Sequence, residues 1–173
     1  MRSVGPSYIT DLQKRERVRF WVEVRRILVP TDLTAGSRKV VKYAATLAAR
    51  CGAQLTVLHV YSEPYNIAYL RGSPAYAWIE WHLHDTRNAL ESFGKEIKER
   101  YCECRTEFRI GMPCEEIINA AQDWQIDLLV IPSHSHKWFR RLACGSNEKE
   151  LLRRVPCPVL LVHEDKHSSY SLN

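Results

Sequence analysis

The 173-residue sequence has no apolar run close to the ~20 residues that a helix needs to cross a bilayer. Its first residues, MRSVGPSYITDLQKRER, also lack the apolar segment of a secretory signal peptide. The six cysteines include no Cys-x-x-Cys pair. In a reducing compartment such cysteines are buried apolar side chains or free thiols, so we expect no disulfides. These absences predict a cytoplasmic protein with no membrane contact.

Sequence motifs of common nucleotide-hydrolysing and acyl-transfer enzymes are also missing. The chain has no GxxxxGK[ST] loop, no Ser-Gly-Gly pyrophosphate loop and no GxSxG nucleophile elbow. Cys114 lies at the start of a predicted helix, but one cysteine with no partner placed beside it is weak evidence for a nucleophile. We therefore do not expect an enzyme.

Three short pairs of His or Cys could suggest zinc, which takes four tetrahedral nitrogen or sulfur ligands. Residues two apart point to opposite faces of a strand, and to well-separated directions on a helix. Neither geometry lets one pair chelate a single ion, so we expect no zinc site. The pairs are His82/His84, Cys102/Cys104 and His134/His136.

The net charge of +5 is concentrated at the N-terminus, because residues 1–26 hold seven Lys or Arg and three Asp or Glu. We divide the chain into a basic extension (1–24), one globular domain (25–163) and a polar tail (164–173). The extension mixes cations with Phe20 and Trp21, as a nucleic-acid or anionic-membrane contact would. A short capped helix that covers the sheet edge or a partner subunit is the simpler interpretation, and we do not expect nucleic-acid binding.

Strand-like and helix-like patterns alternate along the domain, which predicts a single α/β domain with a five-stranded parallel sheet and helices on both faces. Right-handed crossovers give the strand order 3-2-1-4-5. The apolar run IDLLVI indicates a central strand, and the alternating CECRTEFRIG an edge strand. The predicted strands are 25–30, 53–60, 102–111, 126–131 and 157–162, and the predicted helices 37–51, about 79–101, 112–125 and 147–154.

In this strand order the first and fourth strands lie side by side where the winding direction reverses. Ligands of such sheets bind at the carboxyl ends of the strands there. The segments that meet at this point are PTD (30–32) and PSHS (132–135). We therefore expect any ligand site between them.

The chain from Arg26 to Val162 resembles the universal stress proteins. ILVPTDLTAGSRKVVKYAATLAARCGAQLTVLHV is similar to that family's opening strand, helix and strand, and DLLVIPSHSHKWFRRLACGSNEKELLRRVPCPVLLV to its closing unit. The resemblance implies a Rossmann-like fold of the adenine nucleotide alpha hydrolase-like type. It also implies a stress-response protein that pairs as a homodimer through the last strand, with protein partners that the sequence does not identify.

Nucleotide-binding members of the family carry Gly, two residues, Gly, nine residues, then Gly-Ser or Gly-Thr. The same spacing here falls on Pro132, Ser135, Gly145 and Ser146. The resemblance implies an ATP or other adenine-nucleotide site, with Asp32 on the adenine, Val60 lining its pocket and no metal beyond a nucleotide-associated Mg²⁺. The candidate nucleotide-binding residues are Pro30, Thr31, Asp32, Val60, Ile131, His134, Ser135, Gly145, Ser146 and Asn147.

Two of the motif's glycines are replaced. Pro132 has no N–H and a fixed φ, and Ser135 adds a Cβ where a triphosphate needs room. Gly145 and Ser146 keep free N–H groups at a helix start, and nearby cations still favour an anion. These changes predict a degraded phosphate loop with weak nucleotide binding. The alternative is a member without nucleotide that works only through protein contacts, with Asp32 acting merely to cap a loop.

Overall fold

A computed structural model describes residues 23–62, 70–101, 103–133 and 148–163. Within them a five-stranded sheet has the order β3-β2-β1-β4-β5, and all neighbouring strands are parallel. This confirms the predicted fold class and the edge position of the third strand. The elements are β1 (Arg26–Pro30), α2 (Ala35–Cys51), β2 (Gln54–Tyr61), α3 (Pro74–Arg100), β3 (Cys104–Ile110), α4 (Pro113–Asp123), β4 (Leu128–Pro132), α6 (Glu148–Arg154) and β5 (Val159–Val162).

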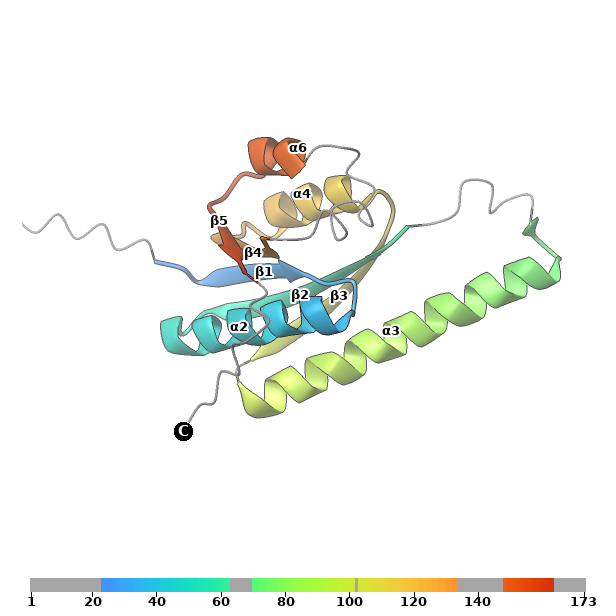
Figure 1. Ribbon diagram of the computed structural model, residues 1–173, viewed down its shortest axis with the longest axis horizontal. Coiled ribbons are helices and arrows are strands. Elements are labelled where there is room, and N and C mark those ends of the chain that lie inside the picture. The colour runs from blue at the N-terminus through green and yellow to red at the C-terminus, as the bar shows by residue number, and fades with distance from the viewer. Residues whose placement is uncertain (1–22, 63–69, 102, 134–147, 164–173) are drawn as a thin grey trace, which may run out of the picture.

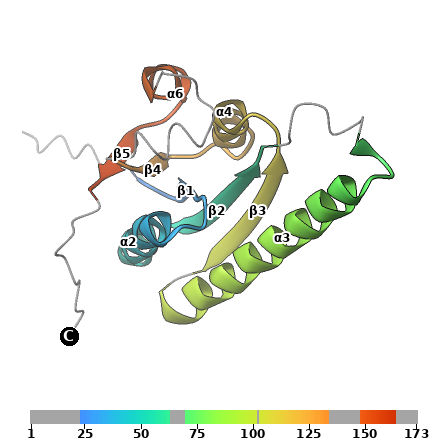
Figure 2. The ribbon, with the colours of Figure 1, turned by 45° about the vertical axis from the view of Figure 1, so that its right-hand side comes forward.

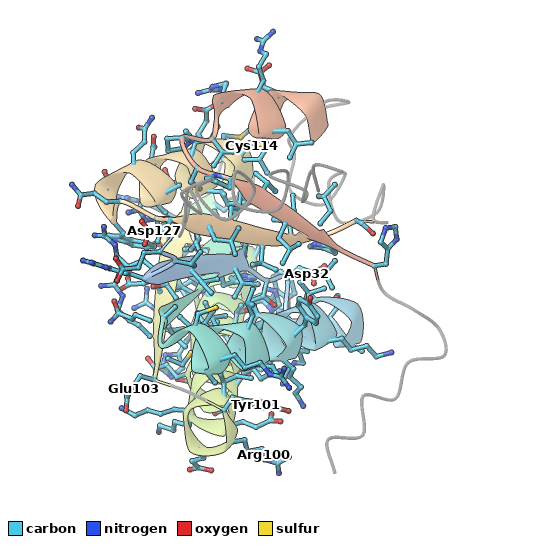
Figure 3. All side chains as sticks on the ribbon, turned by 90° about the vertical axis from the view of Figure 1, so that its left-hand side faces the viewer. Asp32, Arg100, Tyr101, Glu103, Cys114 and Asp127 are labelled. Carbon is cyan, nitrogen blue, oxygen red and sulfur yellow. The ribbon has the colours of Figure 1, made fainter. Side chains whose placement is uncertain are left out.

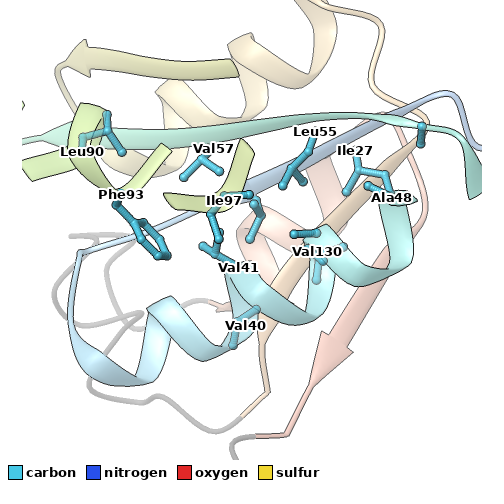
Figure 4. Close-up of a cluster of buried hydrophobic side chains, with 14 residues drawn as sticks. Ile27, Val40, Val41, Ala48, Leu55, Val57, Leu90, Phe93, Ile97 and Val130 are labelled. Carbon is cyan, nitrogen blue, oxygen red and sulfur yellow. The ribbon is translucent and has the colours of Figure 1, made fainter. Parts of the chain in front are cut away.

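Helices cover both faces of the sheet, with α2 and α3 on one face and α4 and α6 on the other (Figures 1 and 2). Each face has its own hydrophobic core, because successive strand residues point to opposite sides. Leu28 and Leu129 pack on the α4 side, whereas Ile27 and Val130 pack on the side of α2 and α3. Figure 4 shows the second of these clusters, to which α3 contributes Leu90, Phe93 and Ile97.

Helix α2 starts at Ala35, two residues before the predicted start at Ser37. Thr34 has an extended backbone and its side chain accepts a hydrogen bond from the N–H of Ser37, so Thr34 is the N-cap. The other end matches the prediction, since Gly52 adopts φ 67° and closes the helix in the left-handed conformation.

Helix α3 is 27 residues long, and it starts at Pro74 rather than near residue 79. Ser73 caps it and Pro74 occupies its first turn, where a missing N–H costs nothing. Its C-terminal half packs tightly on β3, because Gly94 leaves room for the side chain of Thr106. Its first turns extend past the sheet (Figures 1 and 2). Residues of those turns can therefore reach the end of β2.

Asp127 joins the amino ends of the two central strands. Its Oδ2 accepts hydrogen bonds from the backbone N–H groups of Arg25 (3.0 Å) and Arg26 (2.8 Å). Its own backbone N–H donates to the carbonyl oxygen of Arg26 (2.9 Å). Figure 3 labels Asp127 and Asp32 at opposite ends of the sheet. The amino end is thus closed by hydrogen bonds, and the opposite end carries the candidate site.

The expectation of no disulfides is wrong at Cys114, which is disulfide-bonded. Pairing depends on distances in the folded chain and not on spacing in the sequence. Cys51 and Cys157 are free thiols. Among the described residues, no helix is both long and apolar enough to span a membrane.

Candidate functional site

Strands β1 and β4 stop pairing before they end. Their register covers Ile27 with Leu128 and Leu28 with Leu129, whereas β1 stays paired with β2 as far as Pro30. The unpaired residues are at the carboxyl ends of the two strands, where the chain changes winding direction. This is the place at which open α/β sheets bind ligands.

Proline ends both of these strands, and each lacks the N–H that would face the other strand. Successive N–H groups of a strand point to opposite edges. Thr31 donates to Leu58 of β2 (2.8 Å), so an N–H at Pro30 would face β4. Ser133 donates to Val162 of β5 (2.8 Å), so an N–H at Pro132 would face β1. The crevice between β1 and β4 therefore has no donor at either proline.

A network of hydrogen bonds holds the loop between β1 and α2. The Thr31 hydroxyl accepts the N–H of Leu33 (3.0 Å) and lies 2.9 Å from the hydroxyl oxygen of Ser37. Asp32 accepts the N–H of Thr34 (3.1 Å) and its hydroxyl (2.5 Å). Leu33 has φ 60°, a conformation that non-glycine residues rarely adopt. The loop is thus rigidly built, and it fixes the position of the Asp32 carboxylate.

A cavity of about 350 Å³ opens beside this loop. That volume lies within the range of small-molecule sites. Its walls come from the β1–α2 loop, the end of β2 and the second and third turns of α3, and none of the described residues that line it is Lys or Arg. The lining residues are Thr31, Asp32, His59, Val60, Tyr61, Ser62, Trp78 and His82.

His59 is the half-buried imidazole of this cavity. Its Nδ1 lies 2.8 Å from the carbonyl oxygen of Thr31. A carbonyl can only accept, so Nδ1 carries the proton and Nε2 is left as an acceptor in the neutral ring. Burial lowers the pKa of His59, and the hydrogen bond to Thr31 and the charge of Asp32 only partly oppose this effect. His59 is therefore neutral at pH 7, and with Asp32 it gives the cavity two hydrogen-bond acceptors.

Aromatic rings from α3, β2 and β3 form a continuous chain along one wall. The Trp78 indole stacks on the His82 imidazole, with centroids 5.2 Å apart and planes 8° from parallel. His82 contacts Tyr61 (6.1 Å), and Tyr61 stacks on Phe108 (6.3 Å). Phe108 in turn lies beside His59, at 5.5 Å. Trp78 is thus backed by a row of rings anchored in the sheet.

The structure brings three of the ten predicted site residues to the cavity: Thr31, Asp32 and Val60. Pro30 and Ile131 are buried within their strands and do not line it. Asp32 also accepts the N–H of Thr34 in the loop before α2, which is the capping role that Asp32 has in the alternative interpretation. The remaining five residues lie outside the described part of the chain: His134, Ser135, Gly145, Ser146 and Asn147.

The described start of the phosphate loop provides few donors. Pro132 is the buried last residue of β4 and has no N–H. The next N–H, that of Ser133, is already used by the carbonyl of Val162. The Ser133 hydroxyl is buried and has no hydrogen-bond partner among the described residues. Neither backbone position can donate to a ligand.

Sequence reasoning missed the aromatic half of the cavity. His82 was considered only as half of a zinc pair, and Trp78 was not among the predicted site residues. Their spacing of four residues would place both on one face of a helix, but the predicted helix began only near residue 79 and left Trp78 out. In the described residues no group of three or more His, Cys, Asp or Glu is arranged to hold a metal ion.

The fold and the cavity together define a Rossmann-like α/β protein with a ligand-sized site at the carboxyl end of its central strands. The chain belongs to the universal stress protein family, because the model of that family matches residues 23–163. A relative in Coxiella burnetii, universal stress protein A homolog 1, is 30% identical over 144 residues, which cover 80% of this chain and 95% of the relative.

Solved structures of the family share the fold. UspA from Lactobacillus plantarum has a TM-score of 0.66 at 24% identity, over 80% of this chain and 97% of its own. A universal stress protein in complex with cAMP has a TM-score of 0.58 at 23% identity, over 82% and 98% of the two chains. One from Archaeoglobus fulgidus in complex with dAMP has a TM-score of 0.56 at 18% identity, over 79% and 96%.

Proposed function

We propose that this universal stress protein binds an adenine nucleotide weakly in the cavity at the end of β1 and β2. The observation that carries the proposal is the cavity itself, which Thr31, Asp32 and Val60 line at the carboxyl ends of β1 and β2. A carboxylate held by its own loop is a fixed acceptor for the amino group of adenine. The proteins solved with cAMP and dAMP have the same fold and support an adenine ligand.

Weak binding follows from the phosphate side of the site. Pro132 supplies no N–H to the crevice, and the N–H of Ser133 is committed to β5. A lost hydrogen bond to a charged group costs about 1.5–3 kcal/mol, or about one to two decades of affinity. The role we propose is regulatory binding and not catalysis.

Mass spectrometry of the small molecules that copurify with the full chain tests this function first. Calorimetric titrations with ATP, ADP and AMP then measure the affinities. We expect dissociation constants weaker than about 10 μM, because the phosphate loop is short of donors. No detectable heat for any of the three nucleotides at millimolar concentration would refute the proposed function.

A protein-interaction module without nucleotide is the second candidate, and the capping role of Asp32 favours it. The Asp32 carboxylate already accepts two hydrogen bonds from Thr34, so its role in this turn is enough to explain why an aspartate is present. For either function we propose a cytoplasmic homodimer through β5. That strand lies at the sheet edge, and Leu161 on it is 42% exposed. Light scattering of the wild type and of Leu161→Lys measures the dimer.

A further inference from the structure

The cavity contains a second recognition surface that the family resemblance does not provide. Trp78 and His82 lie one turn apart on α3, and their rings are stacked nearly parallel. Both line the same cavity as Asp32. Trp78 is 60% exposed although its ring is backed by His82, so indole surface remains available for another ring.

The wall behind Trp78 is anchored. His82 contacts Tyr61, which is only 9% exposed, and Tyr61 stacks on Phe108 of the edge strand β3. An aromatic surface held in this way loses little conformational freedom when a ligand binds, which favours affinity. A planar heterocycle is the ligand that matches such a surface, because offset stacking suits a flat π-system.

The charges of the cavity indicate which part of a nucleotide it holds. Its described lining has one carboxylate, Asp32, and no Lys or Arg. A carboxylate repels phosphate, whereas it accepts hydrogen bonds from an amino group or a sugar hydroxyl. The two positions that begin the phosphate loop, Pro132 and Ser133, offer no N–H to a ligand. Favourable contacts are therefore concentrated on the base and the sugar.

We propose that the cavity is a nucleoside site in which an adenine ring stacks on Trp78, so that binding draws on the base rather than on the phosphates. The inference rests on the proposed function and narrows its ligand class to adenosine and AMP. Trp78 is then the residue that compensates for the donors missing at Pro132.

The test is calorimetry of the full chain with adenosine, AMP and ATP. We expect wild-type dissociation constants for the three ligands that agree within about fivefold, which corresponds to about 1 kcal/mol. Trp78→Ala should weaken all three by a common factor of about 5 to 150, the range measured for base stacking on aromatic side chains. Trp78→Phe keeps a ring and should recover most of the affinity.

Trp81→Ala is the matched control, because Trp81 is on the same helix, is also 60% exposed and does not line the cavity. It should leave all three affinities unchanged. Equal affinities for Trp78→Ala and Trp81→Ala would overturn the inference, and so would ATP binding more than about tenfold tighter than adenosine. Both results leave the proposed function intact. A wild-type chain that binds neither nucleoside nor nucleotide refutes the proposed function itself.

Discussion

The imidazole Nδ1 of His59 donates to the carbonyl oxygen of Thr31 over 2.8 Å. This hydrogen bond joins β2 to the residue immediately before Asp32. It also determines which ring nitrogen carries the proton, since only an N–H can satisfy a carbonyl. The tautomer of a cavity residue is thus set by the backbone of the neighbouring strand.

Stability should fall as the pH drops below the ordinary His59 pKa of 6.5. Burial lowers the folded-state pKa of His59, so the unfolded chain takes up the proton first. The stabilisation is fully present above pH 6.5 and is lost as the pH falls through the lower, folded-state pKa. Urea unfolding between pH 8 and pH 5 measures the free energy of unfolding. In His59→Asn, which keeps a donor near the position of Nδ1, the decline should be shallower.

His84→Asn controls for the loss of an imidazole, because His84 is exposed on α3 and does not line the cavity. Parallel pH curves for wild type and His59→Asn, displaced only by a constant free energy, would contradict the role assigned to His59.

Asp32→Asn should weaken adenosine binding by about tenfold, roughly the value of one charge-assisted hydrogen bond. The amide oxygen of Asn can still accept the N–H of Thr34, so the loop and the melting temperature should change little. Its NH₂ group cannot accept from the adenine amine. Comparing adenosine with inosine, which has a carbonyl in place of that amine, reports the loss directly. A wild-type chain that binds both nucleosides equally would rule out Asp32 as the hydrogen-bond acceptor for the adenine amine.

Replacing Pro132 and Ser135 by glycine should increase ATP affinity by about one to two decades, because it restores an N–H that faces β1 at the crevice. Adenosine has no phosphate and should bind the variant as it binds the wild type. The ratio of the two dissociation constants, measured by calorimetry, separates phosphate effects from base effects. An unchanged ratio would show that the loop is not the limiting defect.

Gly94→Ala should destabilise the protein by about 1–3 kcal/mol, because a Cβ there would overlap Cγ2 of Thr106. Adding Thr106→Ser removes that methyl group. The atoms of residue 106 nearest to the added Cβ are then its own Cβ at 3.5 Å and Oγ1 at 3.7 Å. The double variant should therefore be more stable than Gly94→Ala alone. Thermal unfolding of the two single variants and the double variant gives the coupling free energy, and strict additivity would argue against the overlap.

Asp127→Ala should cost about 2 kcal/mol, since the backbone N–H groups of Arg25 and Arg26, at the amino end of β1, lose a charged acceptor. Hydrogen exchange at Arg25 and Arg26 should accelerate in this variant. Adenosine affinity should stay the same, because Asp127 lies at the opposite end of the sheet from Asp32 (Figure 3). Unchanged exchange at both amides would contradict the capping role.

The sequence was sufficient for the sheet order, because apolar strands alternated with amphipathic helices and right-handed crossovers leave few arrangements. The strand order alone placed PTD (30–32), and with it Asp32, at the end of the sheet where the cavity lies, whereas Val60 was proposed only through the family resemblance. The start of α2 was placed late, since Ser37 and Thr34 are both good caps and the hydrogen bonds between them decide which one acts. Trp78 and Cys114 could not be assigned, because their roles depend on which residues the fold places beside them.

Pro30 and Pro132 together limit how far β1 and β4 can pair. In a parallel sheet two adjacent strands normally stay paired until one of them ends, because each N–H that faces the neighbour donates to a carbonyl there. Here the pairing ends at Leu28 and Leu129, and the next N–H that each strand would direct at the other is missing because a proline stands there. The proline at position 132, which we propose weakens triphosphate binding, is thus also a residue at which the pairing of β4 with β1 cannot continue. The N–H of a glycine at position 132 can donate either to a ligand or to β1. Competition between these two acceptors limits how much ATP affinity the substitution restores.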